Sequence, residues 1–157
     1  MALQIGQQAP DFTLFNTEKK EISLSEQKGQ NVLLLFFPLA FTSVCTAELC
    51  SVRDNLKIYE GLNAKPFGIS VDSLHTLKKF KEDQNLNFEL LSDFNKETSK
   101  AYGALYDTFG HGMKGVSKRA AFVIDESGLI RYAEVLENAS LQPNFEAIRK
   151  ALSALKV

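Results

Sequence analysis

Residues 32–50 read VLLLFFPLAFTSVCTAELC, and the order of residue types in this stretch predicts a strand, a loop and a helix. The first six residues are apolar with no polar face, which is typical of a central strand covered on both sides. Pro38 ends the strand, because proline has no backbone N–H to donate to a neighbouring strand. From Ala47 onward apolar residues recur at helical spacing, through Leu49, Val52 and Tyr59. We therefore expect one helix that begins close to residue 43 and contains these positions.

Further strand and helix patterns lie on both sides of this stretch. Alternating residues at 11–15 and 21–24, separated by turn-like residues, predict an N-terminal β-hairpin. We also expect strands at 66–71, 120–124 and 129–136, and helices around 74–80, at 95–102 and at 144–155. These elements indicate an α/β fold built as a three-layer sandwich. The length and the hydrophobic content of 45% suit one domain over residues 1–157 with a single sizeable core.

The charge pattern limits the classes of partner. Eighteen basic and nineteen acidic residues leave a formal net charge of -1, and no basic block is present, which argues against binding to nucleic acid. The first ten residues lack a basic segment followed by a long apolar one, and the apolar run at 32–37 is too short to cross a bilayer. We expect a soluble, cytoplasmic protein with no membrane partner.

Both cysteines of the chain, Cys45 and Cys50, lie in the opening stretch. Two cysteines are too few for a secreted disulfide scaffold, and a reducing compartment keeps such residues as thiols. Cys45 is expected at the start of the helix, at the carboxyl edge of the sheet, where unpaired N–H groups and the helix dipole stabilise a thiolate. That position favours a nucleophile. Thr42 could direct its hydroxyl to the sulfur or to a substrate oxygen, and the ring of Pro38 could shield the pocket from water.

The spacing of the two cysteines limits what they can do together. On an ideal helix, five residues correspond to about 140° around the axis and about 7.5 Å along it. The two Cα atoms would then be about 8.5 Å apart, beyond the ~7 Å that a disulfide spans, so a bond requires the first helical turns to unwind. A structural zinc site fits poorly, since His75 and His111 are single and distant in sequence. The remaining alternative is that both cysteines are small apolar core residues.

Pro38, Thr42 and Cys45 match the P-x-x-x-T-x-x-C signature of the peroxiredoxins, so the chain resembles this family of thiol peroxidases. The segments 9–12 (APDF) and 118–125 (KRAAFVID) are also similar to family segments, and the resemblance spans nearly the whole chain. It implies a thioredoxin-like three-layer α/β/α sandwich with a central mixed sheet and an N-terminal β-hairpin.

The resemblance also implies roles for the matching residues. Cys45 would be the peroxidatic cysteine, which attacks the peroxide O–O bond and becomes a sulfenic acid. Thr42 would orient the peroxide, and Pro38 would keep water away from the sulfur. Arg119 would stabilise the thiolate and the transferred oxygens.

The residues themselves leave the roles of the arginine and of a nearby acid open. Nothing in the sequence alone separates Arg119 from three other arginines, Arg53, Arg131 and Arg149, although we expect Arg53 to form a pair on the helix surface. Glu48 matches an acid that braces the active-site arginine in many relatives. It can equally be an ordinary glutamate of the first helical turns, favoured there by the helix dipole.

Two subgroups of the family share features with this chain. The segment FFPLAFT at 36–42 is similar to the AhpE-like group, many of whose members have one working cysteine. The pattern from Cys45 to Cys50 is similar to the bacterioferritin comigratory protein group, also called peroxiredoxin Q, in which a cysteine five residues on resolves the sulfenic acid. The resemblance implies a peroxide substrate, a resolving Cys50 and a thioredoxin or glutaredoxin-like reductant, with no metal, haem or flavin cofactor.

The sequence leaves two alternatives to a peroxidase with two working cysteines. One alternative is a one-cysteine enzyme in which Cys50 is inert. Another is a thioredoxin-fold redox switch or binding protein without useful turnover. Relatives are monomers or dimers joined near the active-site helix, and for this chain we expect a homodimer.

Overall fold

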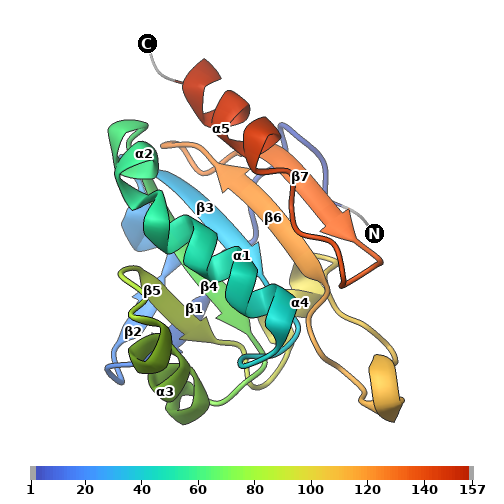
Figure 1. Cartoon of the computed structure of the whole chain (residues 1–157). Helices are drawn as coiled ribbons and strands as arrows, with labels where there is room; N and C mark the ends of the chain where they lie inside the picture. The colour runs from blue at the N-terminus through green and yellow to red at the C-terminus, as the bar shows by residue number, and fades with distance from the viewer. Residues whose placement is uncertain (1–2, 156–157) are drawn as a thin grey trace.

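A computed structural model describes residues 3–155, whose strands form one seven-stranded sheet (Figure 1). The strands are β1 (Thr13–Asn16), β2 (Glu21–Ser23), β3 (Asn31–Phe36), β4 (Ala64–Ser70), β5 (Glu89–Ser92), β6 (Arg119–Ile124) and β7 (Ile130–Leu136). The α-helices are α1 (Ser43–Asp54), α2 (Leu56–Gly61), α3 (Leu74–Gln84), α4 (Glu97–Ala101) and α5 (Phe145–Ala154). Two short 3-10 helices, η1 (Leu24–Gln27) and η2 (Gly110–Gly112), complete the described elements.

The sheet is mixed, with the strand order β2-β1-β5-β4-β3-β6-β7. Strands β3, β4 and β5 run parallel, whereas β6 and β7 form an antiparallel pair beside β3. Strands β1 and β2 pair antiparallel, with Thr13 opposite Ser23. The predicted mixed sheet and N-terminal hairpin are therefore confirmed. Strand β5, which the sequence analysis did not predict, joins the hairpin to the parallel strands.

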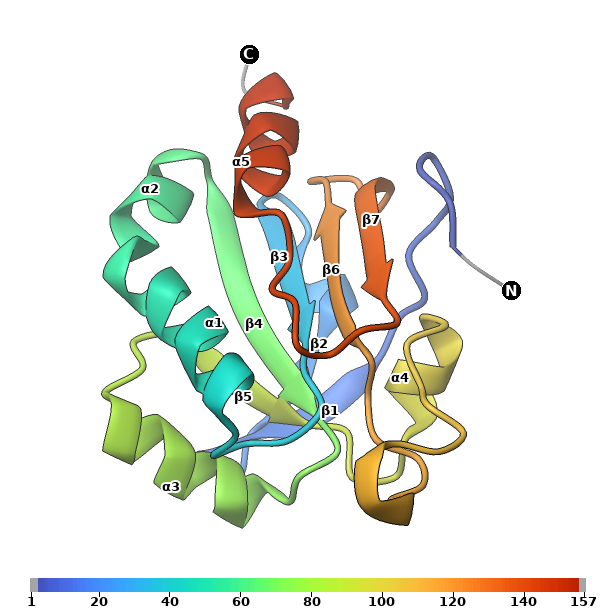
Figure 2. The same cartoon turned by 45° about the vertical axis from the view of Figure 1, so that its right-hand side comes forward.

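Strand β3 separates two hydrophobic clusters, and all six of its residues are buried. Leu33 and Leu35 belong to the cluster that contains residues of α1, α2, α3 and α5. Leu34 and Phe36 belong to the other cluster, together with Tyr102, which follows α4. Figure 2 shows α1 and α2 on one side of the sheet and α4 on the other. The alternation along β3 therefore produces the three layers, as predicted.

The helix predicted from residue 43 onward is divided at Asn55 into α1 and α2. The side-chain Nδ2 of Asn55 donates to the carbonyl oxygen of Ser51 at 2.8 Å, and its backbone adopts the non-helical angles φ -114° and ψ 19°. An asparagine side chain that bonds to the backbone one turn earlier competes with the helical hydrogen bonds. The apolar spacing continues across this break, so periodicity alone predicted one helix.

Strand pairing brings distant parts of the sequence to one edge of the sheet. Strand β6 runs antiparallel to β3, with Ala120 opposite Phe36. Because the two strands run in opposite directions, the first residue of β6, Arg119, lies beside the end of β3. The loop to α1 begins at the same end, so the fold places Arg119 next to the start of that helix. None of the helices within residues 3–155 is long and apolar enough to span a membrane.

Candidate active site

The loop between β3 and α1 is fixed to the end of the neighbouring strand. Pro38 is buried, and the backbone N–H of Ala40 donates to Oδ2 of Asp72 at 2.8 Å. Asp72 follows β4, and the same Oδ2 accepts a hydrogen bond from the hydroxyl of Ser70 at 2.6 Å. A carboxylate that accepts from both the loop and the strand makes the loop position depend on the sheet.

Phe41 carries the conformational strain of this loop. Its φ of 68° is in the left-handed region, which bulky residues rarely adopt, and the residue is 50% exposed. The ring lies against Phe80 of α3, with 5.1 Å between the ring centroids. Thr42 then caps α1 with an extended backbone. Its hydroxyl donates to the carbonyl oxygen of Leu39 at 2.7 Å, which leaves the lone pairs of the Thr42 hydroxyl able to accept.

Cys45 is the third residue of α1 and is 1% exposed. Nη2 of Arg119 donates to its Sγ at 3.3 Å. Because Cys45 belongs to the first turn of α1, the unpaired N–H groups of that turn and the positive end of the helix dipole lie at the same end of the helix as its sulfur. A permanent guanidinium charge and a helix N-terminus both attract an anionic sulfur.

Arg119 is held by two other groups besides the sulfur. Its Nη1 donates to Oε1 of Glu48 at 2.6 Å. Its Nε and Nη2 donate to the carbonyl oxygen of Ala139 at 3.1 Å and 2.8 Å. Burial lowers the pKa of Arg119, but the charges of Glu48 and Cys45 more than offset this effect, and the pKa is raised. The guanidinium therefore remains charged at neutral pH.

Glu48 is fully buried one turn after Cys45. Burial raises the pKa of Glu48 to about 7, although the charge and hydrogen bond of Arg119 act in the opposite direction. Among the described residues, Oε2 of Glu48 has no hydrogen-bond partner. One carboxylate oxygen thus holds the arginine, and the other has no direct protein partner in residues 3–155.

Cys50 does not belong to the group formed by Cys45, Glu48 and Arg119. It is half-buried, and its Sγ donates to Oε1 of Gln84, the last residue of α3, at 3.5 Å. Both cysteines are free thiols. Arg53, on the same helix, pairs with Asp54 at 2.9 Å, as the sequence analysis expected of a surface arginine.

The structure therefore brings three of the predicted site residues, Cys45, Glu48 and Arg119, into direct contact through the guanidinium. Pro38 and Thr42 lie in the loop that leads to them, and Cys50 faces α3 instead. Sequence reasoning missed the carboxylate of Asp72 and the carbonyl of Ala139. Asp72 had a usable signal, since an acid directly after a parallel strand lies at the same edge of the sheet. A backbone carbonyl has none.

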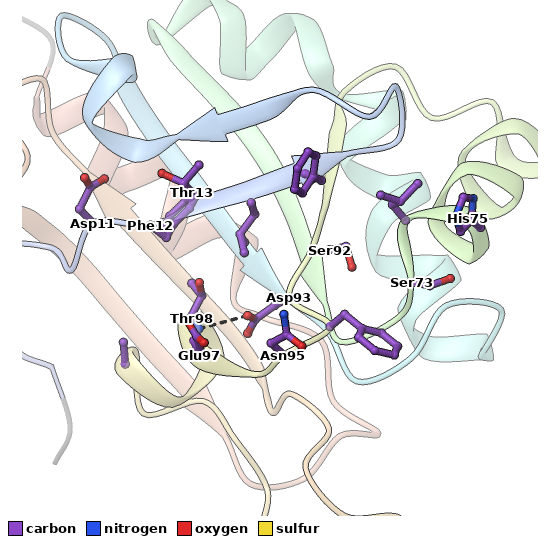
Figure 3. Close-up of a pocket in the computed structure, with 15 residues that line it drawn as sticks. Asp11, Phe12, Thr13, Ser73, His75, Ser92, Asp93, Asn95, Glu97 and Thr98 are labelled. Atoms are coloured by element: carbon purple, nitrogen blue, oxygen red, sulfur yellow. Dashed lines mark hydrogen bonds between the residues drawn. The ribbon is translucent and has the colours of Figure 1, made fainter.

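A groove of about 500 Å³ lies elsewhere on the molecule, between β1, the start of α3 and the β5–α4 connection (Figure 3). Its buried Asp93 accepts hydrogen bonds from the backbone N–H groups of Thr98 and Ser99, at 3.1 Å and 2.6 Å, and so caps α4. Neither Cys45 nor Arg119 lines this groove. Within residues 3–155, no group of three or more His, Cys, Asp and Glu residues could hold a metal ion.

Comparisons with known proteins identify the family of the chain. The AhpC/TSA family model matches residues 5–133. Alkyl hydroperoxide reductase E of Mycobacterium tuberculosis is 40% identical over 136 residues, which cover 85% of this chain and 86% of that protein. A putative peroxiredoxin bcp of Haemophilus influenzae is 35% identical over 155 residues and 98% of both chains.

A solved structure shows the same fold as this chain. The crystal structure of peroxidoxin BcpB from Mycobacterium tuberculosis superposes with a TM-score of 0.87 at 27% identity, covering 99% of both chains. The thioredoxin-like fold implied by the sequence motifs is thereby confirmed. The chain belongs to the AhpC/TSA family and is a thiol peroxidase of the peroxiredoxin type.

Proposed function

We propose that Cys45 is the peroxidatic nucleophile of this thiol peroxidase. The 3.3 Å contact between Nη2 of Arg119 and Sγ of Cys45 carries the proposal. The thiolate attacks one peroxide oxygen, the O–O bond breaks, and the other oxygen leaves as an alkoxide or hydroxide that takes up a proton. The sulfur loses two electrons and becomes a sulfenic acid, while the peroxide is reduced to an alcohol or water.

The surrounding residues have separate tasks in this proposal. Arg119 supplies fixed donors to the thiolate and to the negative charge that develops on the oxygens. The hydroxyl of Thr42, whose proton is directed to Leu39, accepts a hydrogen bond from the peroxide and orients it. Buried Pro38 keeps water away from the reacting sulfur, and Glu48 holds Arg119 in place.

Cys50 resolves the sulfenic acid in the second step that we propose. Its thiolate attacks the sulfur of the Cys45 sulfenic acid, the S–O bond breaks, and a disulfide forms while the oxygen leaves as hydroxide and takes up a proton to become water. The step requires the first turns of α1 to unwind and the contact between Cys50 and Gln84 to break. Hydrogen peroxide and organic hydroperoxides are the proposed substrates. A thioredoxin or glutaredoxin-like dithiol protein would restore both thiols in a reducing cytoplasm, and the proposed assembly is a homodimer.

The first test measures oxidation of the reduced protein by hydrogen peroxide. The chain contains no tryptophan, so rapid quenching followed by mass spectrometry is a suitable readout. We expect Cys45→Ser to abolish formation of the sulfenic acid. Cys50→Ser, the matched variant on the same helix, should still form the sulfenic acid. An unchanged oxidation rate in Cys45→Ser would refute the proposed nucleophile.

The second test identifies the product after one equivalent of hydrogen peroxide. An intramolecular disulfide between Cys45 and Cys50 supports resolution within one chain. A persistent sulfenic acid in monomeric protein would instead support a one-cysteine enzyme, which the contact of Cys50 with α3 favours. In that case a low-molecular-weight thiol or a glutaredoxin-like protein would reduce Cys45 directly.

A further inference from the structure

The guanidinium of Arg119 is anchored along two different edges. Glu48 accepts only from Nη1, at 2.6 Å. The carbonyl oxygen of Ala139 accepts from Nε and Nη2, at 3.1 Å and 2.8 Å. With Glu48 alone, the guanidinium could turn about this single contact and carry Nη2 away from the sulfur. The second anchor at Ala139 fixes the plane of the group, and with it the donor that faces Cys45.

The orientation of the Ala139 carbonyl is set by a turn that begins at Asn138. Oδ1 of Asn138 accepts from the backbone N–H of Ser140 at 3.0 Å and from its hydroxyl at 2.6 Å. The backbone N–H of Leu141 donates to the carbonyl oxygen of Asn138 at 3.2 Å. Ala139 lies between the partners of these bonds, so the direction of its peptide group depends on the turn.

The segment before the turn is also fixed to the site. The hydroxyl of Tyr106 donates to the carbonyl oxygen of Glu137 at 2.7 Å. Nζ of Lys118 donates to the carboxylate of Glu137 at 2.6 Å. Lys118 directly precedes Arg119, the first residue of β6, and Glu137 directly follows β7. The contact therefore joins the segment before the turn to the segment that carries the active-site arginine. The side chain of Asn138 itself is exposed and belongs to neither hydrophobic cluster.

We propose that Asn138 is a positioning residue for the peroxidase reaction, acting through the Ala139 carbonyl on the guanidinium of Arg119. The inference rests on the proposed roles of Cys45 and Arg119. When Asn138 loses its acceptor, the turn relaxes, the carbonyl leaves Nε and Nη2, and the arginine no longer holds its donor against the sulfur. Both the reaction with peroxide and the attraction of negative charge to Cys45 then weaken.

The test compares Asn138→Ala with Asn138→Asp, which keeps an oxygen at the accepting position. We expect Asn138→Ala to slow sulfenic acid formation about tenfold, because small displacements of a positioned group cost large factors in rate. The pH profile of Cys45 alkylation by iodoacetamide, followed on its peptide by mass spectrometry, should move to higher pH. Asn138→Asp should restore both measurements to near the wild-type values.

The chain offers a matched control at the other end of β6. Asp125 makes the same kind of turn, accepting from the N–H and hydroxyl of Ser127 at 3.0 Å and 2.8 Å. It follows the last residue of β6, about 20 Å of strand from Arg119. Asp125→Ala should lower thermal stability and leave the oxidation rate of the folded protein unchanged. Equal losses of rate in Asp125→Ala and Asn138→Ala would overturn the positioning role, as would an unchanged rate in Asn138→Ala.

The outcomes also separate this inference from the proposed function. If Cys45→Ser keeps the oxidation rate, the proposed nucleophile is wrong and the role of Asn138 fails with it. If Cys45→Ser loses the rate while Asn138→Ala keeps both the rate and the alkylation profile, only the role of Asn138 is wrong.

Discussion

Glu48 and Arg119 form a buried ion pair, with 2.6 Å between Oε1 and Nη1 and side-chain exposures of 0% and 2%. The pair joins α1 to the first residue of β6, across the edge at which Cys45 lies. A buried charge is costly unless it is paired and hydrogen-bonded. The pair therefore matters to the fold as well as to the orientation of the arginine.

Removal of Glu48 should destabilise the protein strongly. Glu48→Ala leaves the guanidinium without one of its acceptors, and breaking a buried pair on one side costs about 3–5 kcal/mol of unfolding free energy. Glu48→Gln keeps an oxygen that can accept from Nη1, so its loss should be clearly smaller. Urea unfolding followed by circular dichroism measures both variants. Equal losses for the two would show that the hydrogen bond to Arg119 contributes little.

The buried carboxyl should also produce a pH dependence of stability. Burial raises the pKa of Glu48 from 4.5 to about 7 in the folded protein. The folded state then binds this proton more tightly than the unfolded state. The stabilising contribution is complete below about pH 4.5 and is lost as the pH rises through about 7.

The Glu48→Gln variant isolates this contribution. We expect the unfolding free energy of the wild type, relative to that of Glu48→Gln, to fall steadily between about pH 4.5 and pH 7. All other titrating groups are common to both proteins, so their effects cancel in the difference. A difference that stays constant with pH, or that rises, would contradict the raised pKa of Glu48.

Much of the fold could be predicted from the local sequence pattern. The apolar run of β3 and the turn chemistry of both hairpins determine structure locally, and the strands and helices formed where these signals are strong. Strand β5 was missed because it has only four residues and begins at a charged one, Glu89, after the polar segment that ends α3. The break at Asn55 was missed because the apolar spacing continues across it, although an asparagine whose side chain bonds to the backbone one turn earlier is found there.

Local sequence order predicted the position of the cysteine in the site, but not the contacts that reach it from other parts of the chain. The position of Cys45 in the first turn of α1 followed from the strand, proline and helix order. Arg119 and Cys45 are 74 positions apart in the sequence, and their contact depends on the antiparallel pairing of β6 with β3. No local pattern of the residues contains this pairing, so only the family motif indicated this arginine. The carbonyl of Ala139 could not be found at all, because every residue has one.

Arg119→Lys should lower the oxidation rate although it keeps the positive charge. The guanidinium reaches Cys45, Glu48 and Ala139 through separate nitrogens, and a single ammonium group cannot reproduce this geometry. We expect a loss of about a hundredfold in the rate with hydrogen peroxide, as for removal of a donor from a preorganised site. Arg131→Lys, at a pair with Asp125 in which the arginine is 42% exposed, is the control and should leave the rate unchanged.

The anchor of the active-site loop gives the last prediction. Oδ2 of Asp72 accepts from the backbone N–H of Ala40 at 2.8 Å, directly before Phe41 with its strained φ of 68°. Asp72→Ala removes this acceptor, so Phe41 can relax toward a less strained conformation and shift the cap residue Thr42. We expect the oxidation rate to fall about tenfold, since the hydroxyl that orients the peroxide is displaced. Asp72→Asn, which keeps an accepting oxygen, should lose much less, and Asp54→Ala, on the surface of α1, should lose nothing. A rate in Asp72→Ala equal to that of the wild type would show that the loop holds its conformation without the carboxylate.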